Sequence, residues 1–463
     1  MSINSALLAG ASGLIANSSA LAAISDNIAN VNTIGYKRAN SVFTPLYDAG
    51  GSGASGRYSA AGVNSVARLA IGEGGLLTPG ASATDLAIAG RGFFVVRNDP
   101  LADANDPVAF TRSGRFTPDE LGYLRNDSGK YLSGWPVAAD GSVPANPSDL
   151  NNLETINLSS IGGAAEATTS MGINANLQQS QTVSAAEATY DPTVSGTNMA
   201  SGNVTPDFQR SIPFYDSVGG VRTLTISMLK SSTPNQWHTE IHMVPAGDVT
   251  TGAGLVDGQL LTGTVAFDPQ GRLDTANTTL PTTVDFLSST NVAPLGANQF
   301  QWATATGIDA QTIQLDFAGN NSAGGFTQYD SPSTLGSTNV NGSAFGNFSS
   351  VEVDDDGFVF AKFNNGIVRK IYQIPVATFI NPDGLEAQAG GTFTVTPESG
   401  AYTLTAPGLG SAGNISASTL ESSNVDLATE FTNLITTQRA YSASSKIITT
   451  ADEMLDEAIR MKR

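Results

Sequence analysis

The sequence predicts a mainly β protein whose two ends are helical. Both termini carry apolar residues at seven-residue intervals, and the interior alternates short β-branched and aromatic runs with turn residues. The length of 463 residues suits about two to four compact units. Only 14% of the residues are charged. We therefore expect nested β domains, an inner discontinuous one and an inserted outer one, plus coiled-coil-like helices at the N- and C-termini.

The N-terminal segment, residues 1–31, is predicted to be a helix with one narrow apolar stripe. Its first row recurs every seven positions and consists of Leu7, Leu14, Leu21 and Ile28. The second row, offset from the first, consists of Ile3, Gly10, Asn17, Ile24 and Val31. This four-three spacing is typical of a helix that packs against another helix. Because weak helix formers are frequent here, the stripe needs a partner to be stable.

The C-terminal segment, residues 413–463, is predicted to be the matching helix, and residues 425–463 contain neither Pro nor Gly. Its first row consists of Leu427, Leu434, Tyr441, Ile448 and Leu455. Its second row begins at Phe431 and continues through Gln438, Ser445, Asp452 and Ile459. We interpret both terminal stripes as surfaces that order when they meet other copies of the chain. The alternative is that they pack only within their own chain.

Between the helices the pattern is that of strands and turns. Residues 32–70 are predicted to be a linker or arm, with a Gly/Ser-rich stretch at 48–62. Residues 71–170 and 346–412 are predicted to form the two parts of the inner β domain, and residues 171–345 the inserted outer one. Asp or Asn followed by Gly at the fourth position predicts tight turns at 119–122, 268–271, 354–357 and 381–384.

Composition and spacing give no catalytic, cofactor or metal site. The chain has no Cys, and its net charge of −19 disfavours nucleic acid as a partner. The two histidines, His238 and His242, lie in an alternating strand pattern, where four residues span about 13 Å, too far for one ion. The Gly90 and Gly92 pair lacks the rest of a dinucleotide motif and predicts a close approach of another backbone.

No targeting or membrane segment is predicted at the N-terminus. The first basic residue is Lys37, so the positive start of a secretory signal peptide is missing. No uninterrupted run of about 18 apolar residues occurs, so direct membrane insertion is not expected.

Four stretches resemble the axial proteins of the bacterial flagellum, and among them the hook subunits. They are SDNIANVNTIGYKRA at 25–39, the strands and turns at 85–124, the segment 353–400, and the C-terminal segment 420–459. Together they cover roughly half of the chain, in the family's order. Rod subunits share these ends but are much shorter, so the length of the chain and its insert favour a hook subunit.

The resemblance implies a structural, non-enzymatic subunit that assembles with itself into a flexible tube and transmits motor torque to the filament. It implies partners in the flagellar rod, the hook cap and the hook–filament junction, and an extracellular location reached without a cleaved signal peptide. It also places Tyr36, Lys37 and Arg38 at a contact between subunits; the alternative is an ordinary surface turn. Two alternatives stay open: a rod subunit with an enlarged insert, and a secreted β-rich adhesin or binding module.

Overall fold

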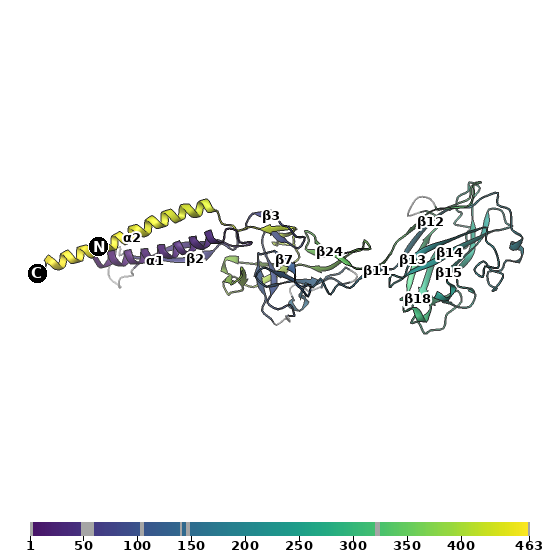
Figure 1. Cartoon of the computed structure of the whole chain (residues 1–463), viewed down its shortest axis with the longest axis horizontal. Helices are drawn as coiled ribbons and strands as arrows, with labels where there is room; N and C mark the ends of the chain where they lie inside the picture. Colours follow the sequence, from purple (N-terminus) through teal and green to yellow (C-terminus); the bar gives the residue numbers. More distant parts are fainter. Residues whose placement is uncertain are drawn as a thin grey trace. The chain divides into compact units, whose positions relative to one another are not determined.

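The computed structural model describes residues 3–47, 60–101, 106–138, 141–144, 149–319 and 325–461. The chain divides into two compact units. Unit 1 comprises Met1–Ile161, Ser350–Ala361 and Arg369–Arg463, and unit 2 comprises Gly162–Ser349 and Lys362–Val368. Both units are built mainly from strands, and unit 1 carries a long helix at each end of the chain (Figure 1). The predicted fold class is therefore confirmed.

The strands that lie in unit 1, a few of which reach one or two residues across its boundary, are given in chain order. They are β1 (Ala39–Tyr47), β2 (Ala60–Leu69), β3 (Leu77–Pro79), β4 (Leu86–Ala89), β5 (Phe93–Arg97), β6 (Ala109–Thr111), β7 (Phe116–Pro118), β8 (Leu124–Asn126), β9 (Tyr131–Pro136), β10 (Glu154–Thr155), β24 (Phe348–Val353), β25 (Phe358–Phe363), β26 (Val368–Gln373), β27 (Val376–Phe379), β28 (Glu386–Gln388), β29 (Thr392–Thr394), β30 (Tyr402–Thr405), β31 (Asn414–Ala417) and β32 (Thr419–Glu421). The main sheet follows the order β24-β25-β26-β9-β5-β6-β29-β28.

The core of unit 1 lies on strands from both parts of the inner domain. Phe93 on β5 makes edge-to-face contacts with Phe379 and Phe393, whose ring centroids lie 5.6 and 5.7 Å away. Phe93 and Phe393 are almost fully buried. Because β5 precedes unit 2 in the chain and β27 and β29 follow it, these aromatic contacts join the two halves of the discontinuous domain.

The two helices are α1 (Ile3–Ala29) and α2 (Leu427–Met461). α2 begins at residue 427 and not at 413, because residues 414–421 form β31 and β32, which pair with β4 and β3. Asp426 then caps the helix, since its carboxylate accepts the backbone N–H groups of Ala428 and Thr429 at 2.8 and 3.2 Å.

Residues 32–70 are not only a linker. Within them β1 and β2 pair in antiparallel register from Ala39 opposite Leu69 to Tyr47 opposite Ala60. The hairpin forms because apolar residues such as Val42 and Val66 face each other across it. Most of the Gly/Ser-rich stretch at 48–62 lies outside the described residues.

Unit 2 is a sandwich of two sheets. One follows β16-β19-β18-β20-β12-β21, with β22 also on β12, and the other follows β13-β14-β15-β17. A single buried cluster takes residues from both sheets, including Ile226, Ile241 and Phe286, as expected for sheets packed face to face. Its strands are β11 (Ala164–Glu166), β12 (Ser170–Asn176), β13 (Phe208–Tyr215), β14 (Val221–Lys230), β15 (Gln236–Val244), β16 (Val249–Thr251), β17 (Gln259–Ala266), β18 (Thr283–Leu287), β19 (Phe300–Trp302), β20 (Gln311–Asp316), β21 (Phe326–Thr327), β22 (Thr334–Val340) and β23 (Ser343–Gly346).

Candidate assembly surface

Helix α1 packs against α2 and against the β1–β2 hairpin (Figure 1). Small residues allow the close approach of the two helices: a Cβ on Gly10 would lie only 3.0 Å from Cγ1 of Ile448. The most buried side chains of α1 are likewise small or polar, namely Ala16, Ala20 and Asn27. The two terminal helices therefore pair within one chain, as in the alternative given above, and the hairpin supplies a second partner that the sequence pattern did not indicate.

The predicted N-terminal row lies at the margin of this packing. Leu7, Leu14, Leu21 and Ile28 are all partly buried. The neighbouring Leu8 and Ile15 are more accessible, with 64% and 67% of their surface exposed. The apolar surface available to another molecule on α1 is therefore displaced from the predicted row.

The face of α2 that turns inward is only partly the predicted one. It comprises buried or partly buried residues at four-three spacing, namely Glu430, Leu434, Thr437, Ser444, Ile448, Ala451 and Leu455. Leu434, Ile448 and Leu455 belong to the predicted first row. The predicted second row is offset by one residue from most inward positions, so Phe431, Gln438, Asp452 and Ile459 are exposed, whereas its fifth member, Ser445, is partly buried.

An apolar surface therefore remains open on α2. Phe431 is 51% exposed and Ile447 is 49% exposed. Other large apolar side chains with substantial exposure on this helix are Leu427, Ile435, Tyr441, Met454 and Ile459. A helix in a soluble monomer normally keeps such residues on its buried face, so this distribution is typical of a surface that binds another molecule.

Polar contacts join the C-terminal end of α1 and the N-terminal end of α2, here called the helix roots, to each other and to the first hairpin strand. Asn27 near the end of α1 donates to the carbonyl of Ala39 at 2.9 Å and to Oε2 of Glu430 at 3.3 Å. Its side-chain oxygen accepts the N–H of Ala39 at 2.8 Å and the hydroxyl of Tyr36 at 3.3 Å. Burial raises the pKa of the Tyr36 phenol, and the nearby Asp26 and Glu430 carboxylates act in the same direction.

A buried ionic cluster lies next to this anchor. One oxygen of Glu421 lies 2.5 Å from Nζ of Lys37, and the other lies 3.0 Å from Nη1 of Arg112. The Lys37 and Glu421 side chains are each only 1% exposed. Burial lowers the pKa of Lys37, while the charge of Glu421 opposes that shift. The Lys37 ammonium therefore has an internal contact in unit 1. That Tyr36 and Lys37 lie at a contact between subunits stays a prediction.

Arg112, Glu421, Asn27 and Glu430 were not singled out from the sequence. They are far apart in the chain, and each is an ordinary polar residue in its local pattern. One sequence signal for this cluster was available. Glu421 lies shortly before the start of one terminal helix and Lys37 shortly after the end of the other, and these two ends lie close together when the helices pair.

The histidines lie in unit 2 on β15, which confirms the predicted strand. Burial lowers the pKa of His242 to about 4, so its imidazole is neutral near pH 7. His238 lies 3.5 Å from an oxygen of Glu187. Over the described residues, no group of three or more His, Asp or Glu side chains is arranged to hold a metal ion.

Residues Ala6–Ala29 form a stretch whose length and mean hydropathy of 1.6 are sufficient to cross a membrane. The criterion of an uninterrupted apolar run missed this, because Ser, Asn and Gly interrupt a segment that is apolar on average. Core helices of soluble proteins have the same length and hydropathy, and here the segment packs on α2 and the hairpin. That the chain does not insert in a membrane stays a prediction.

Two β units, one inserted into the other in the sequence, paired terminal helices and exposed apolar side chains along α2 are the features of a structural protein that functions through contacts. Family models match residues 7–37 (flagella basal body rod protein), 87–176 (flagellar hook protein FlgE/F/G D1 domain), 185–343 (flagellar basal body protein FlaE D2 domain) and 416–461 (flagellar basal body rod FlgEFG protein C-terminal). The flagellar hook protein FlgE of Caulobacter vibrioides is 40% identical, and that of Rhizobium meliloti 33%, with 100% of each chain covered in both cases. The chain belongs to the flagellar hook protein family, a family of structural subunits.

The predicted resemblance to hook subunits is thus confirmed, and the adhesin and rod alternatives are not favoured, since these whole-length relatives are hook proteins. Among solved structures, the Helicobacter pylori flagellar hook protein FlgE2 matches with a TM-score of 0.42 and 15% identity, over 73% of this chain and 98% of that one.

Proposed function

We propose that this chain polymerises with copies of itself through its terminal helices and forms the flexible tube of the flagellar hook, which transmits torque to the filament. It acts there as a structural subunit without catalysis or cofactor. Its other contacts are with the rod, the hook cap and the hook–filament junction, and it reaches the extracellular hook without a cleaved signal peptide. Family membership supports the assignment to the hook, and the exposed apolar side chains of α2 support the assembly mode.

The observation that carries the assembly mode is the exposure of Phe431 and Ile447 in a helix that already has an intrachain partner. Covering one such side chain contributes about 1.5–3 kcal/mol. That is equivalent to about one or two orders of magnitude in affinity. Several such residues per copy are enough to drive association against the entropy that binding costs.

The test compares exposed and inward positions on the same helix. In purified full-length chains, Phe431→Glu and Ile447→Glu should leave the helicity and unfolding of the monomer unchanged. Both should raise the concentration needed for polymerisation at least about tenfold. Leu434→Glu should affect monomer unfolding as well, because Leu434 is partly buried. Gln438→Glu is the control, since it places the same charge at an exposed polar position.

Polymers are measured by sedimentation and by electron microscopy, where curved tubes of uniform diameter are expected. If Phe431→Glu and Ile447→Glu polymerise like the unmodified chain, the terminal helices do not carry assembly. Labelled protein in purified basal structures should be found in the hook; a position in the rod would support the rod alternative.

A further inference from the structure

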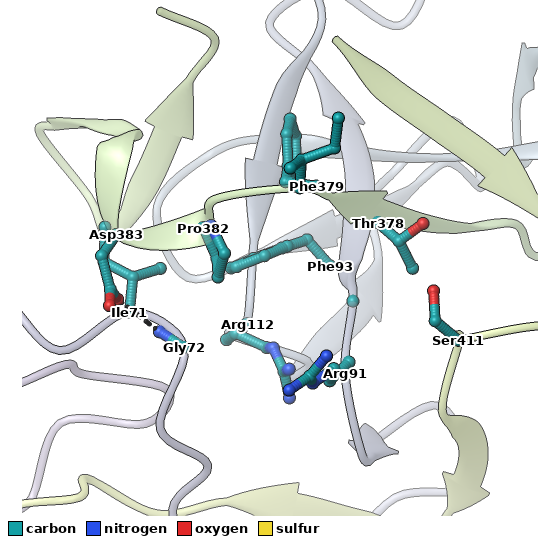
Figure 2. A pocket seen from close by; sticks show the side chains of 12 residues that line it. Ile71, Gly72, Arg91, Phe93, Arg112, Thr378, Phe379, Pro382, Asp383 and Ser411 are labelled. Atoms are coloured by element: carbon teal, nitrogen blue, oxygen red, sulfur yellow. Dashed lines mark hydrogen bonds between the residues drawn. The ribbon is translucent and has the colours of Figure 1, made fainter. Parts of the chain in front are cut away.

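A cavity of about 340 Å³ opens on unit 1, where strands and loops of the inner β domain line it. Figure 2 shows its two kinds of lining side chains. Phe93 and Phe379 supply apolar surface, and Arg91 and Arg112 bring guanidinium groups to the same space. Ile380 also lines the cavity. Ile380 is 91% exposed at the rim, so its side chain is available to a partner.

The electrostatics of the cavity favour an anion. Arg91 is exposed, and none of the ion pairs among the described residues involves its side chain. Arg112 uses its terminal nitrogens on Glu421 and on backbone carbonyls, and its buried Nε has no hydrogen-bond partner. Asp383 on the opposite wall accepts the N–H of Gly72 at 2.8 Å. Lys37 is the second cation bound to Glu421. The cavity and its surroundings therefore hold three cationic side chains, two of them arginines, and two carboxylates, those of Glu421 and Asp383.

The charge of the cavity also limits which chemical groups a partner can place in it. The chain has 41 acidic and 22 basic residues, so a positive cavity is an exception on an acidic molecule. Its complement is a carboxylate next to an apolar side chain, which would meet the arginines and the rim together. A second copy of this chain supplies that combination on an exposed turn.

The turn lies between β7 and β8 at residues 119–122. The carboxylate of Asp119 is used inside the turn, where it accepts the N–H groups of Leu121 and Tyr123 at 3.0 and 2.8 Å. Glu120 is exposed, and no hydrogen bond or ion pair among the described residues engages its carboxylate. Leu121 is 65% exposed. The internal hydrogen bonds hold this acidic and apolar tip in one conformation.

We propose that the cavity receives the β7–β8 turn of a neighbouring copy, with Glu120 beside Arg91 and Leu121 against Phe379 and Ile380. This inference rests on the proposed polymerisation and names one contact within it. Because the cavity and the turn are different surfaces of the same unit, the contact is heterologous. Repeated contacts of that type form rings or open helical polymers, which agrees with a tube.

Charge reversal tests the pair. Arg91→Glu and Glu120→Arg should each raise the concentration needed for polymerisation by about tenfold or more, because each brings like charges together. The double variant Arg91→Glu with Glu120→Arg should restore most of the loss. Arg369→Glu and Glu398→Arg, at other exposed positions of unit 1, are controls for net charge. Circular dichroism and urea unfolding of each monomer check that the variants fold.

Every outcome decides the proposal. Two impaired single variants with recovery in the double variant support it. Single variants that polymerise like the controls overturn it, and so do two impaired single variants without recovery, because Glu120 is then not the partner of Arg91. In each case the unmodified chain is measured alongside. If the unmodified chain does not polymerise, the proposed function is wrong. If it polymerises but the Arg91 and Glu120 variants show no interaction between these residues, only the proposed contact is wrong.

Discussion

Neutralising Glu421 should destabilise unit 1 more than any surface charge change. The Glu421 carboxylate is hydrogen-bonded to two buried cations, Lys37 and Arg112. It also accepts the N–H of Gly75 at 2.8 Å. Glu421→Gln keeps the shape of the side chain but leaves two buried cations without a counter-charge.

The expected loss is about 3–5 kcal/mol, the cost of removing one partner from a buried ion pair. It is large compared with the total stability of a domain, about 5–15 kcal/mol. The matched control is Glu73→Gln. Glu73 pairs with Arg38 at 3.1 Å, but its side chain is 59% exposed, so the same substitution should cost no more than about 1 kcal/mol.

The assay follows unit 1 by its own fluorophore. The chain has three tryptophans, and only Trp135 lies in unit 1, where it is buried. With Trp237 and Trp302 replaced by Phe, urea unfolding monitored by fluorescence reports on unit 1. Adding Lys37→Met to Glu421→Gln should recover part of the stability, because one uncompensated cation is gone. Equal losses for Glu421→Gln and Glu73→Gln would refute the argument.

Three further predictions concern single residues. Because burial lowers the pKa of His242 from 6.5 to about 4, the unfolded chain binds a proton between these pH values that the folded chain does not. Unit 2 should therefore lose up to about 3 kcal/mol as the pH falls through this window, and His242→Gln should flatten the slope in urea titrations at several pH values. Gly10→Leu should lower the helicity measured by circular dichroism, because its side chain would collide with Ile448. Trp302→Ala removes a ring stacked on Phe286 at 4.2 Å and should lower the stability of unit 2 by about 3–5 kcal/mol in urea unfolding, with the signal of Trp135 unchanged.

Turns and close approaches were predictable because local chemistry decides them. Gly122, Gly271 and Gly357 each donate to the carbonyl of the Asp three positions earlier and each have a positive φ, as the predicted turns require. Gly90 meets the backbone of Gly413, since a Cβ there would lie 3.0 Å from its Cα. In each case glycine fits a positive φ or a close backbone contact, so the sequence pattern alone identifies the position.

The register of the helix pair was less predictable, because a seven-residue repeat does not state which neighbouring row faces inward. The seven-residue pattern puts Phe431 in the second inward row, whereas the structure buries Glu430. Glu430 can be buried because Asn27 of α1 donates to it, a pairing across about four hundred residues that local patterns do not contain.

The difference between apolar and polar contacts explains how copies of the chain can associate while each copy keeps a defined shape. Apolar contacts such as those offered by Phe431 are non-directional, so copies can shift slightly against one another at small cost. The contacts at the helix roots are directional: Asn27 satisfies both backbone groups of Ala39, and Glu421 meets its cations with separate oxygens. A shift there would leave buried polar groups without partners, at about 1–3 kcal/mol for each group. Bending of the proposed tube should therefore occur at contacts between copies, while the joint between the helix pair and the inner β strands of each copy stays fixed.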